Sequence, residues 1–517
     1  SLSLSTPRND LSRVSHDRIR FPLATGYAIR LSRRAGYAIM GGMKTNVFLF
    51  AFLAAASAVA ASAALPSGLE VDAGDRLVFP EPLRNFELRG EFLTDPDAEA
   101  AVGFHCPDEA SGYEVLFRNG PVDGTRKSGS LSHVRNLYRS LAADGVWSGF
   151  SIDVRGKTVE VRIRDVPVVR YAEPADPWRS AAHRGQRFGR GGLAFAGVKG
   201  RVRFRNLVCT PLPDDARPAW PVRAPVDERT DRAIRLQQRD FPVIDWHVHL
   251  KGGLTRAEAF EKSQNYGINY GVAPNLGEGG VGEMFLTDAA ARGYLAEARR
   301  WPFLCSAQGE GRRWAFQFAP STFAAFDCLF TDSMTVVDGG RPLRIYRADE
   351  FNLNGRTEEE WMDFLVSQIE NILAHEPVDI YANATFLPEP LQPRYEELWT
   401  APRVKRVLDT LARYGIALEI SARYKIPSLR IISAAKARGI KFTFGTNNEK
   451  SEFGRLEYAL DAAEKCGLTK EDMWFPSLSV RAARKAVPWN TFGVPPAAGP
   501  QGAAAPASQA EPPVPSR

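Results

Sequence analysis

The chain has 517 residues, of which 44% are hydrophobic and 24% are charged. This composition is typical of globular proteins and excludes collagen, coiled coil and bulk disorder; the length predicts two or three domains at roughly 150 residues each. The net charge is +6. Residues 1–63 contain seven Arg, one Lys and two Asp, so they carry this whole excess and the remaining chain is neutral. A neutral remainder lacks the electrostatic footprint of a nucleic-acid partner.

Residues 43–63 have the three parts of a secretory signal peptide. A basic start is followed by an apolar run over residues 47–56 and by small residues up to Ala63. The run is shorter than the ~20 residues of a spanning helix, and no later stretch reaches that length, so no membrane span is expected. We predict cleavage after Ala63 and a periplasmic or secreted protein. Residues 1–42 are expected to be a disordered or mis-started leader.

Residues 65–212 carry the pattern of an all-β domain. Short alternating runs are separated by turn residues at roughly the 8 to 12 residue spacing of a sandwich. These runs are residues 86–92, 113–117, 150–154, 159–163 and 202–208. One apolar face per strand predicts two antiparallel sheets packed face to face. Export permits a disulfide, for which Cys106 and Cys209 are the pair considered. The proline-rich residues 213–240 are predicted to be a linker.

Residues 241–488 alternate between strands and helices. Strands are predicted at residues 242–250, 268–273, 303–307, 328–334, 378–381, 417–420 and 441–445. Helices are predicted at residues 255–266, 358–374, 403–414, 427–438 and 453–466, the first with Thr255 as N-cap and Gly267 at its end. About seven such units predict an α/β, distorted TIM-like parallel barrel. Residues 489–517, rich in Ala and Pro, are predicted to be a disordered tail.

Two histidines end the first barrel strand. In a parallel barrel the reactive side chains gather at the carboxyl ends of the strands. His247 and His249 lie there, and their period-two spacing puts both imidazoles on the same side of the strand, where they can chelate one cation. The alternative for each histidine is a core or surface position.

The Asp-x-His-x-His motif at residues 245–249, with this order of elements, resembles the polymerase and histidinol phosphatase (PHP) family of metal-dependent hydrolases over about residues 240–476. The resemblance implies a metal-binding Glu at Glu310 and likens residues 417–421, which contain Glu419, to the family's Ala-Leu-Glu-Ile-Asn. The sequence departs from the family elsewhere. Ligand positions of the family are Asn275, Asn383 and Asn447 here, and its final His is Glu449.

These departures leave two interpretations of the barrel. A three-metal site is not expected, because neutral Asn cannot offset the charge of a metal cluster. In the first interpretation, one divalent zinc, manganese or iron ion is held by His247, His249 and Glu310, with Glu419 or Glu449 as a further ligand. Asp332 or Glu449 would then relay the proton of an activated water. In the second, the pocket has lost its metal and binds a polar ligand through Asn275, Asn383, Arg423, Asn447 and Asn448.

Motifs in the β region resemble the 3-keto-disaccharide hydrolase domain, a concanavalin A-like jelly roll. They are residues 127–131, 147–163, 191–194 and 202–207. The family's Gly-Tyr-Glu-x-Gln-x-x-Asp corresponds to residues 112–119, where Glu114 is kept and the Gln and Asp are Leu116 and Asn119. The candidate sugar-pocket residues are His105, Glu114, Arg126 and His133. The alternative for each is a solvated or cross-strand pair.

Two functions follow. The first is an exported carbohydrate-active hydrolase that breaks down a glycoside or 3-keto-glycoside, in which the jelly roll binds or cleaves the sugar and the barrel contributes hydrolysis. The second is a non-catalytic saccharide-binding protein with a degenerate barrel. Both take a small saccharide or glycan as partner. Nucleic-acid processing, by analogy with PHP domains attached to polymerases, is disfavoured by export and by the neutral charge.

Overall fold

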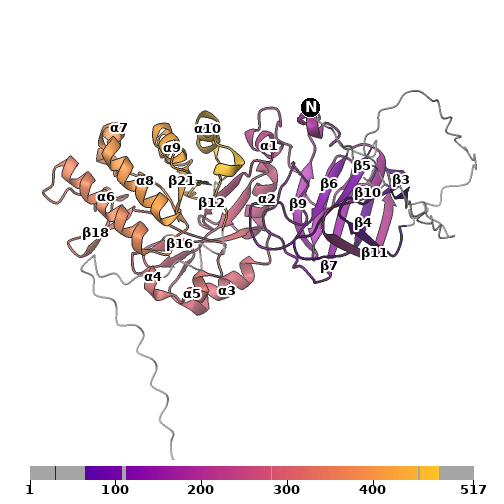
Figure 1. The fold of residues 1–517 in the computed structure, drawn as a ribbon, viewed down its shortest axis with the longest axis horizontal. Coiled ribbons are helices and arrows are strands. Elements are labelled where there is room, and N and C mark those ends of the chain that lie inside the picture. Colours follow the sequence, from indigo (N-terminus) through magenta and orange to yellow (C-terminus); the bar gives the residue numbers. More distant parts are fainter. Residues whose placement is uncertain (1–28, 31–64, 107–111, 281, 452–453, 477–517) are drawn as a thin grey trace, which may run out of the picture.

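The computed structural model describes residues 29–30, 65–106, 112–280, 282–451 and 454–476. The predicted signal peptide and C-terminal tail lie outside these ranges. Figure 1 shows a β-sandwich lying beside a larger part built from strands and helices. None of the helices among the described residues is long and apolar enough to cross a bilayer.

Two antiparallel sheets form the sandwich, in the orders β1-β3-β10-β5-β6 and β2-β11-β4-β7-β8-β9. The elements are β1 Ile29–Arg30, β2 Gly68–Asp72, β3 Arg76–Leu83, β4 Asn85–Thr94, β5 Glu99–Cys106, β6 Tyr113–Phe117, β7 Ser148–Arg155, β8 Thr158–Ile163, β9 Val166–Ala172, the 3-10 helix η1 Ala181–His183, β10 Gly191–Lys199 and β11 Arg201–Leu212. Alternate residues are buried, as Phe150, Ile152 and Val154 are on β7. The predicted sandwich is confirmed.

Seven parallel strands close into a barrel in the order β12-β13-β16-β17-β20-β21-β22, because β12 pairs with both β13 and β22 and β13 pairs with β16. The strands of this half are β12 Ile244–Val248, β13 Asn269–Val272, β14 Asn275–Gly277, β15 Met284–Phe285, β16 Leu304–Glu310, β17 Cys328–Thr331, β18 Thr335–Asp338, β19 Arg341–Arg344, β20 Ile380–Tyr381, β21 Ala417–Ser421 and β22 Phe442–Gly445. The closed parallel barrel is thus confirmed, and its likeness to TIM barrels stays a prediction.

Helices precede, separate and follow the barrel strands. They are α1 Arg232–Gln237, α2 Arg256–Tyr266, α3 Asp288–Ala298, α4 Trp314–Gln317, α5 Pro320–Phe323, α6 Glu358–His375, η2 Glu389–Arg394, α7 Tyr395–Leu398, α8 Ala401–Tyr414, α9 Leu429–Lys436, α10 Glu457–Lys465 and η3 Lys470–Asp472. Helix α2 begins with the predicted cap, since the Thr255 side chain accepts from the Glu258 backbone N–H in a capping box, and it ends at Gly267 with φ 65°.

Three features differ from the sequence-based expectation. Strand β16 continues to Glu310, beyond the predicted end at Ala307, because β14 offers a further parallel partner for its last three residues. The predicted linker contains helix α1, which Asp231 caps. Strand β1 lies within the leader, where no element was expected, and pairs with β3. In addition, no disulfide joins Cys106 to Cys209, the pair considered from the sequence.

The sandwich docks on the amino ends of the barrel strands. Tyr138, from the loop between β6 and β7, packs in one cluster with Ile244, Leu304 and Cys328 at the start of three barrel strands. The neighbouring Arg139 donates through Nη1 to the backbone oxygens of Trp301 and Phe303, each at 2.9 Å. This contact covers the floor of the barrel and leaves the carboxyl ends of its strands, where βα loops converge, on the opposite side.

Candidate functional site at the carboxyl end of the barrel

Side chains from six barrel strands meet in one hydrogen-bonded network at their carboxyl ends. We call it the mouth network; its members are His247, Gln308, Glu310, Asp332, Asn383, Glu419 and Asn447. All except Gln308 were named from the sequence as candidate site residues. The sequence offered a signal for Gln308 as well, because it lies two residues before Glu310 and therefore on the same face of β16.

His247 uses both ring nitrogens inside this network. Nδ1 lies 2.8 Å from Oε2 of Glu419, and Nε2 lies 3.1 Å from Oε1 of Gln308. The Gln308 amide is oriented by its Nε2, which donates to the carboxyls of Glu310 and Asp332. Its Oε1, an acceptor only, thus faces the imidazole, and Nε2 of His247 must carry a hydrogen.

Glu310 and Asp332 form a pair of neighbouring carboxyls. The Gln308 Nε2 lies 2.9 Å from Oε1 of Glu310 and 3.3 Å from Oδ2 of Asp332. Burial raises the pKa of Glu310 to about 8, and the negative charge of Asp332 adds to this rise. Asp332 also accepts from Nδ2 of Asn383 at 2.9 Å. Glu310 is therefore suited to hold a proton near neutral pH beside the carboxyl of Asp332.

The backbone around the mouth network adopts left-handed conformations that non-glycine residues rarely take. Asn383 has φ 45°, Asn447 has φ 42° and Arg312 has φ 51°. The Asn383 backbone N–H donates to Oε1 of Glu419 at 2.9 Å, so this conformation aims a main-chain donor into the site. Strained residues of this kind cluster at functional sites, where the surrounding structure holds them in place.

Lys251 is a further cation near the mouth network that the sequence analysis did not select. Burial lowers its pKa to about 8; the positive charge of Arg423 lowers it further, while Glu449 and Glu310 oppose the shift. It follows His249 by two residues, so the spacing that linked the two histidines also points to it.

The other candidate residues near the mouth network, His249, Arg423, Asn448 and Glu449, make contacts of their own. Nδ1 of His249 donates to the Ala273 oxygen at 2.8 Å. Asn448 braces the same residue, because its Oδ1 accepts from the His249 N–H and its Nδ2 donates to the His249 oxygen. Arg423 donates to the Asn447 oxygen at 3.1 Å and pairs with Glu449, whose side chain is 71% exposed.

Asn275 is buried outside the mouth network. Its backbone N–H and its Nδ2 both donate to the Glu283 oxygen, at 2.8 and 3.4 Å, which anchors the loop after β14. The buried Asn275 and Asn448 therefore hold loops, and only Asn383 and Asn447 of the four predicted amide ligands enter the mouth network.

The donor set does not fit the single-metal interpretation. Both ring nitrogens of His247 have partners within the protein, Nδ1 at Glu419 and Nε2 at Gln308, and Nδ1 of His249 donates to the Ala273 oxygen. Over the parts of the chain that the structure describes, no group of three or more His, Cys, Asp or Glu side chains is arranged to hold a metal ion. The chemistry below is therefore derived from the protein's own side chains.

In the sandwich, His105 is buried and has no nitrogen left for a sugar. Its Nε2 lies 2.8 Å from the Arg84 oxygen and its Nδ1 accepts from the Gly189 N–H at 3.2 Å. Burial lowers its pKa to about 4, so it stays neutral. The geometry gives His105 a structural position between two loops.

The other three sugar-pocket candidates do come together. Arg126 donates through Nη1 to Nε2 of His133 at 2.6 Å and to Oδ1 of Asp240 at 2.7 Å. Burial, followed by the charge of Arg126, lowers the pKa of His133 to about 3. Burial raises the pKa of the half-buried Glu114, which the charges of Arg76 and Arg126 oppose. Through Asp240, which precedes the first barrel strand, this cluster connects the sandwich to the amino-terminal side of the barrel.

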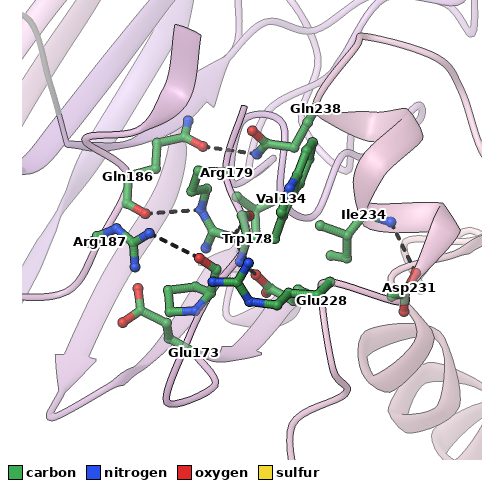
Figure 2. A network of polar contacts seen from close by, with 12 residues as sticks. Val134, Glu173, Trp178, Arg179, Gln186, Arg187, Glu228, Asp231, Ile234 and Gln238 are labelled. Carbon is green, nitrogen blue, oxygen red and sulfur yellow. Dashed lines mark hydrogen bonds and ion pairs between the residues drawn. The ribbon is translucent and has the colours of Figure 1, made fainter. Parts of the chain in front are cut away.

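A second polar network, at the edge of the sandwich, was not anticipated; Figure 2 shows three of its residues, Glu173, Arg179 and Glu228. Arg179 pairs with Glu228 of the predicted linker, and both side chains are at most 1% exposed. Arg179 also donates through Nη2 to the hydroxyls of Tyr113 and Tyr171, each at 2.8 Å. Tyr113 in turn donates to Glu173 at 2.5 Å. We call this set, Tyr113, Tyr171, Glu173, Arg179 and Glu228, the edge network.

The fold and site define a two-domain chain that joins an antiparallel sandwich to a parallel barrel with a carboxyl-rich mouth. Residues 59–209 match the family model of the 3-keto-alpha-glucoside-1,2-lyase-like domain. This match agrees with the resemblance read from the motifs of the β region. It leaves the barrel outside its range, and the PHP resemblance stays a prediction. No curated protein matches the sequence.

Solved structures resemble part of this chain at low identity. A candidate glycosyl hydrolase from Parabacteroides distasonis is 13% identical, with a TM-score of 0.26 over 28% of this chain and 81% of that one. A carbohydrate-binding module from Bacillus subtilis is 11% identical, with a TM-score of 0.20 over 28% of this chain and 91% of that one. At these scores neither carries a functional argument.

Proposed function

We propose that the protein is an exported hydrolase of glucosides and that the mouth network performs the reaction. The observation that carries the proposal is the carboxyl pair, in which Glu310, with its pKa raised to about 8, adjoins Asp332. Glycoside hydrolysis uses two such carboxyls, one as general acid and one as base or nucleophile. The glucoside class is taken from the name of the domain that residues 59–209 match.

In this proposal Glu310 donates its proton to the glycosidic oxygen as the bond from that oxygen to the anomeric carbon breaks. Asp332 accepts a proton from the water that attacks the same carbon. Water thus supplies the new hydroxyl of the sugar, the aglycone leaves with the Glu310 proton, and solvent returns the carboxyls to their starting states. Gln308 holds both carboxyls through one amide nitrogen, which fixes their separation.

The experiment is a screen of sugar release from α-glucosides, β-glucosides and their 3-keto forms. Wild type should release sugar from at least one class, and Glu310→Gln should reduce its turnover by about 10²- to 10⁴-fold, the usual contribution of a general acid. Glu297→Gln, a change at an exposed position on α3, is the matched control and should leave turnover unchanged. Equal rates for the two variants would remove Glu310 from the reaction.

The alternative is a saccharide-binding protein without activity of its own, in which the barrel is a scaffold. The cluster of Glu114, Arg126 and His133 on the sandwich favours this alternative as a sugar contact. It predicts saccharide binding that Glu114→Ala abolishes, with no release of sugar from any substrate. The same screen, read for binding and for turnover, separates the two functions.

Export rests on the pattern of residues 43–63, which lie outside the described residues. We propose that the chain is cleaved after Ala63. Amino-terminal sequencing of the protein recovered from the periplasm or medium of a bacterial host should begin at Ala64. A chain that remains in the cytoplasm with residues 43–63 attached would contradict export.

A further inference from the structure

A cavity of about 650 Å³ lies beside the barrel mouth, between the loop after β20, helix α7, the loop after β21 and helix α10. Four aromatic side chains line it, and they are Phe386, Tyr395, Tyr424 and Tyr458. Its volume falls within the range of small-molecule sites.

The cavity adjoins the mouth network through its wall. Phe386 follows the strained Asn383 by three residues, and its ring lies 5.1 Å from that of Tyr424 in an edge-to-face arrangement. Tyr424 follows Arg423, which bonds to the Asn447 oxygen. Burial raises the pKa of Tyr424, and the carboxyls of Asp332 and Glu419 contribute to the rise. Tyr424 therefore lines the cavity and is also within electrostatic reach of the reacting carboxyls.

One polar group in the cavity wall lacks a partner. Ser428 is the N-cap residue of α9, yet its side chain makes no cap hydrogen bond. Its Oγ is buried and, among the described residues, has no hydrogen-bond partner. A Ser at this position usually accepts from the first turn of the helix. A buried hydroxyl without a partner is costly, so it is suited to bond to a ligand that enters the cavity.

The chemistry of the lining favours an uncharged, hydroxyl-rich ligand. Glu396 and Arg430, at the rim, pair with each other and cancel their charges, which leaves the exposed Lys425 as the one other charged side chain of the lining. Aromatic rings present flat faces for the C–H groups of a sugar, and Ser428, Gln392 and Lys425 offer hydrogen bonds at the edges. A pocket with apolar walls and a few polar groups is the usual form of a small-ligand site.

We propose that this cavity is a subsite for a neutral glucose-containing oligosaccharide, whose neighbouring unit occupies the mouth network. This inference rests on the proposed function, and it goes beyond it by naming a substrate of more than one sugar unit and the residues that hold the additional unit. Tyr424 contacts that unit, and Ser428 bonds to one of its hydroxyls.

The test is calorimetric titration of the full mature chain carrying Glu310→Gln, so that turnover does not consume the probe. The probes are glucose, maltotetraose, cellotetraose and laminaritetraose. At least one tetrasaccharide should bind at least ten-fold more tightly than glucose. Adding Tyr424→Ala should weaken that binding about ten-fold, and Ser428→Ala by about two- to ten-fold, since one hydrogen bond is lost. Adding Tyr414→Ala, an exposed tyrosine on α8, is the control and should change nothing.

Two results would overturn the subsite. One is that no tetrasaccharide binds more tightly than glucose; the other is that Tyr424→Ala, Ser428→Ala and Tyr414→Ala all bind equally well. Ser428→Ala removes a single oxygen that has no hydrogen-bond partner among the described residues, so it keeps the test decisive if Tyr424→Ala fails to fold. Failure of the proposed function would give a different result. The wild-type protein would then bind the tetrasaccharide, with Tyr424→Ala weakening that binding, but it would release no sugar from it.

Discussion

The edge network of the sandwich and the mouth network of the barrel are both buried and polar, yet they are built in opposite ways. In the edge network the one cation, Arg179, pairs with the carboxylate of Glu228 and donates to two tyrosine hydroxyls. Each charge or hydrogen-bond donor there therefore has an opposite charge or an acceptor beside it. In the mouth network two carboxyls, Glu310 and Asp332, share one amide donor. A network in which every polar group has a partner stabilises the fold. Two neighbouring carboxyls, one of them with a raised pKa, are instead typical of catalytic sites.

The comparison can be sharpened first at Asp332. Replacing it by Asn keeps the shape but removes the base and the charge beside Glu310, so turnover should fall by about 10²- to 10⁴-fold. The pKa of Glu310 should also fall below about 8, because one cause of its rise is lost. The pH–rate profile of wild type should decline above pH 8 as Glu310 ionises. In Asp332→Asn the same alkaline decline of any residual activity should begin at a pH below 8. An unshifted profile would contradict the pairing.

The edge network should respond in stability instead. Arg179→Ala leaves Glu228 buried without its cation, which should lower the free energy of unfolding by about 3–5 kcal/mol. The control is Arg190→Ala, at an exposed pair with Asp214, where the loss should be at most about 1 kcal/mol. Denaturant unfolding measures both. The folded fraction of Arg179→Ala should keep normal turnover per molecule, and a catalytic loss there would break the contrast between the networks.

A pH effect on stability follows from Glu310. Its pKa is about 8 in the folded protein, whereas the ordinary value of 4.5 applies to the unfolded chain. Between these two pH values the folded protein keeps a proton that the unfolded chain releases. The contribution of Glu310 to stability is full below pH 4.5 and is lost as the pH rises to 8. The unfolding free energy of wild type, relative to Glu310→Gln, should therefore be lower at pH 8 than at pH 5. A constant difference would mean that Glu310 titrates normally.

The smallest effect is expected at Glu449. Its side chain is 71% exposed and pairs with Arg423, although the sequence marked it as a proton relay. Glu449→Gln should change turnover by less than about two-fold, because it lies outside the mouth network and an exposed ion pair contributes little. A loss of ten-fold or more would place Glu449 in the reaction and would extend the site to its rim.

Local patterns were sufficient to predict much of the fold. Alternating runs predicted the sandwich strands, and the Thr255 cap with Gly267 predicted both ends of α2. The end of β16 could not be read in this way, because its extension to Glu310 depends on pairing with β14. Pairing between distant segments leaves no trace in the composition of either one.

Only part of the site could be predicted from the sequence. Residues at strand ends, such as His247, Asp332, Asn383 and Glu419, were found because the barrel topology brings strand ends together. The sequence could not tell that Asn448 braces a loop or that His105 bonds to two backbone groups. It also missed Arg179 with Glu228, because a Pro-rich segment gave no sign of the buried partner across the sandwich edge.

The most direct test of the central claim compares two glutamates on one substrate. Glu310 lies in the mouth network and Glu114 on the sandwich, and burial raises the pKa of both. Single-turnover rates of sugar release should be measured for Glu310→Gln and Glu114→Gln at pH 7 under saturating protein. The account predicts a loss of about 10²-fold or more for Glu310→Gln and a wild-type rate for Glu114→Gln. The reverse result would move the chemistry from the barrel to the sandwich.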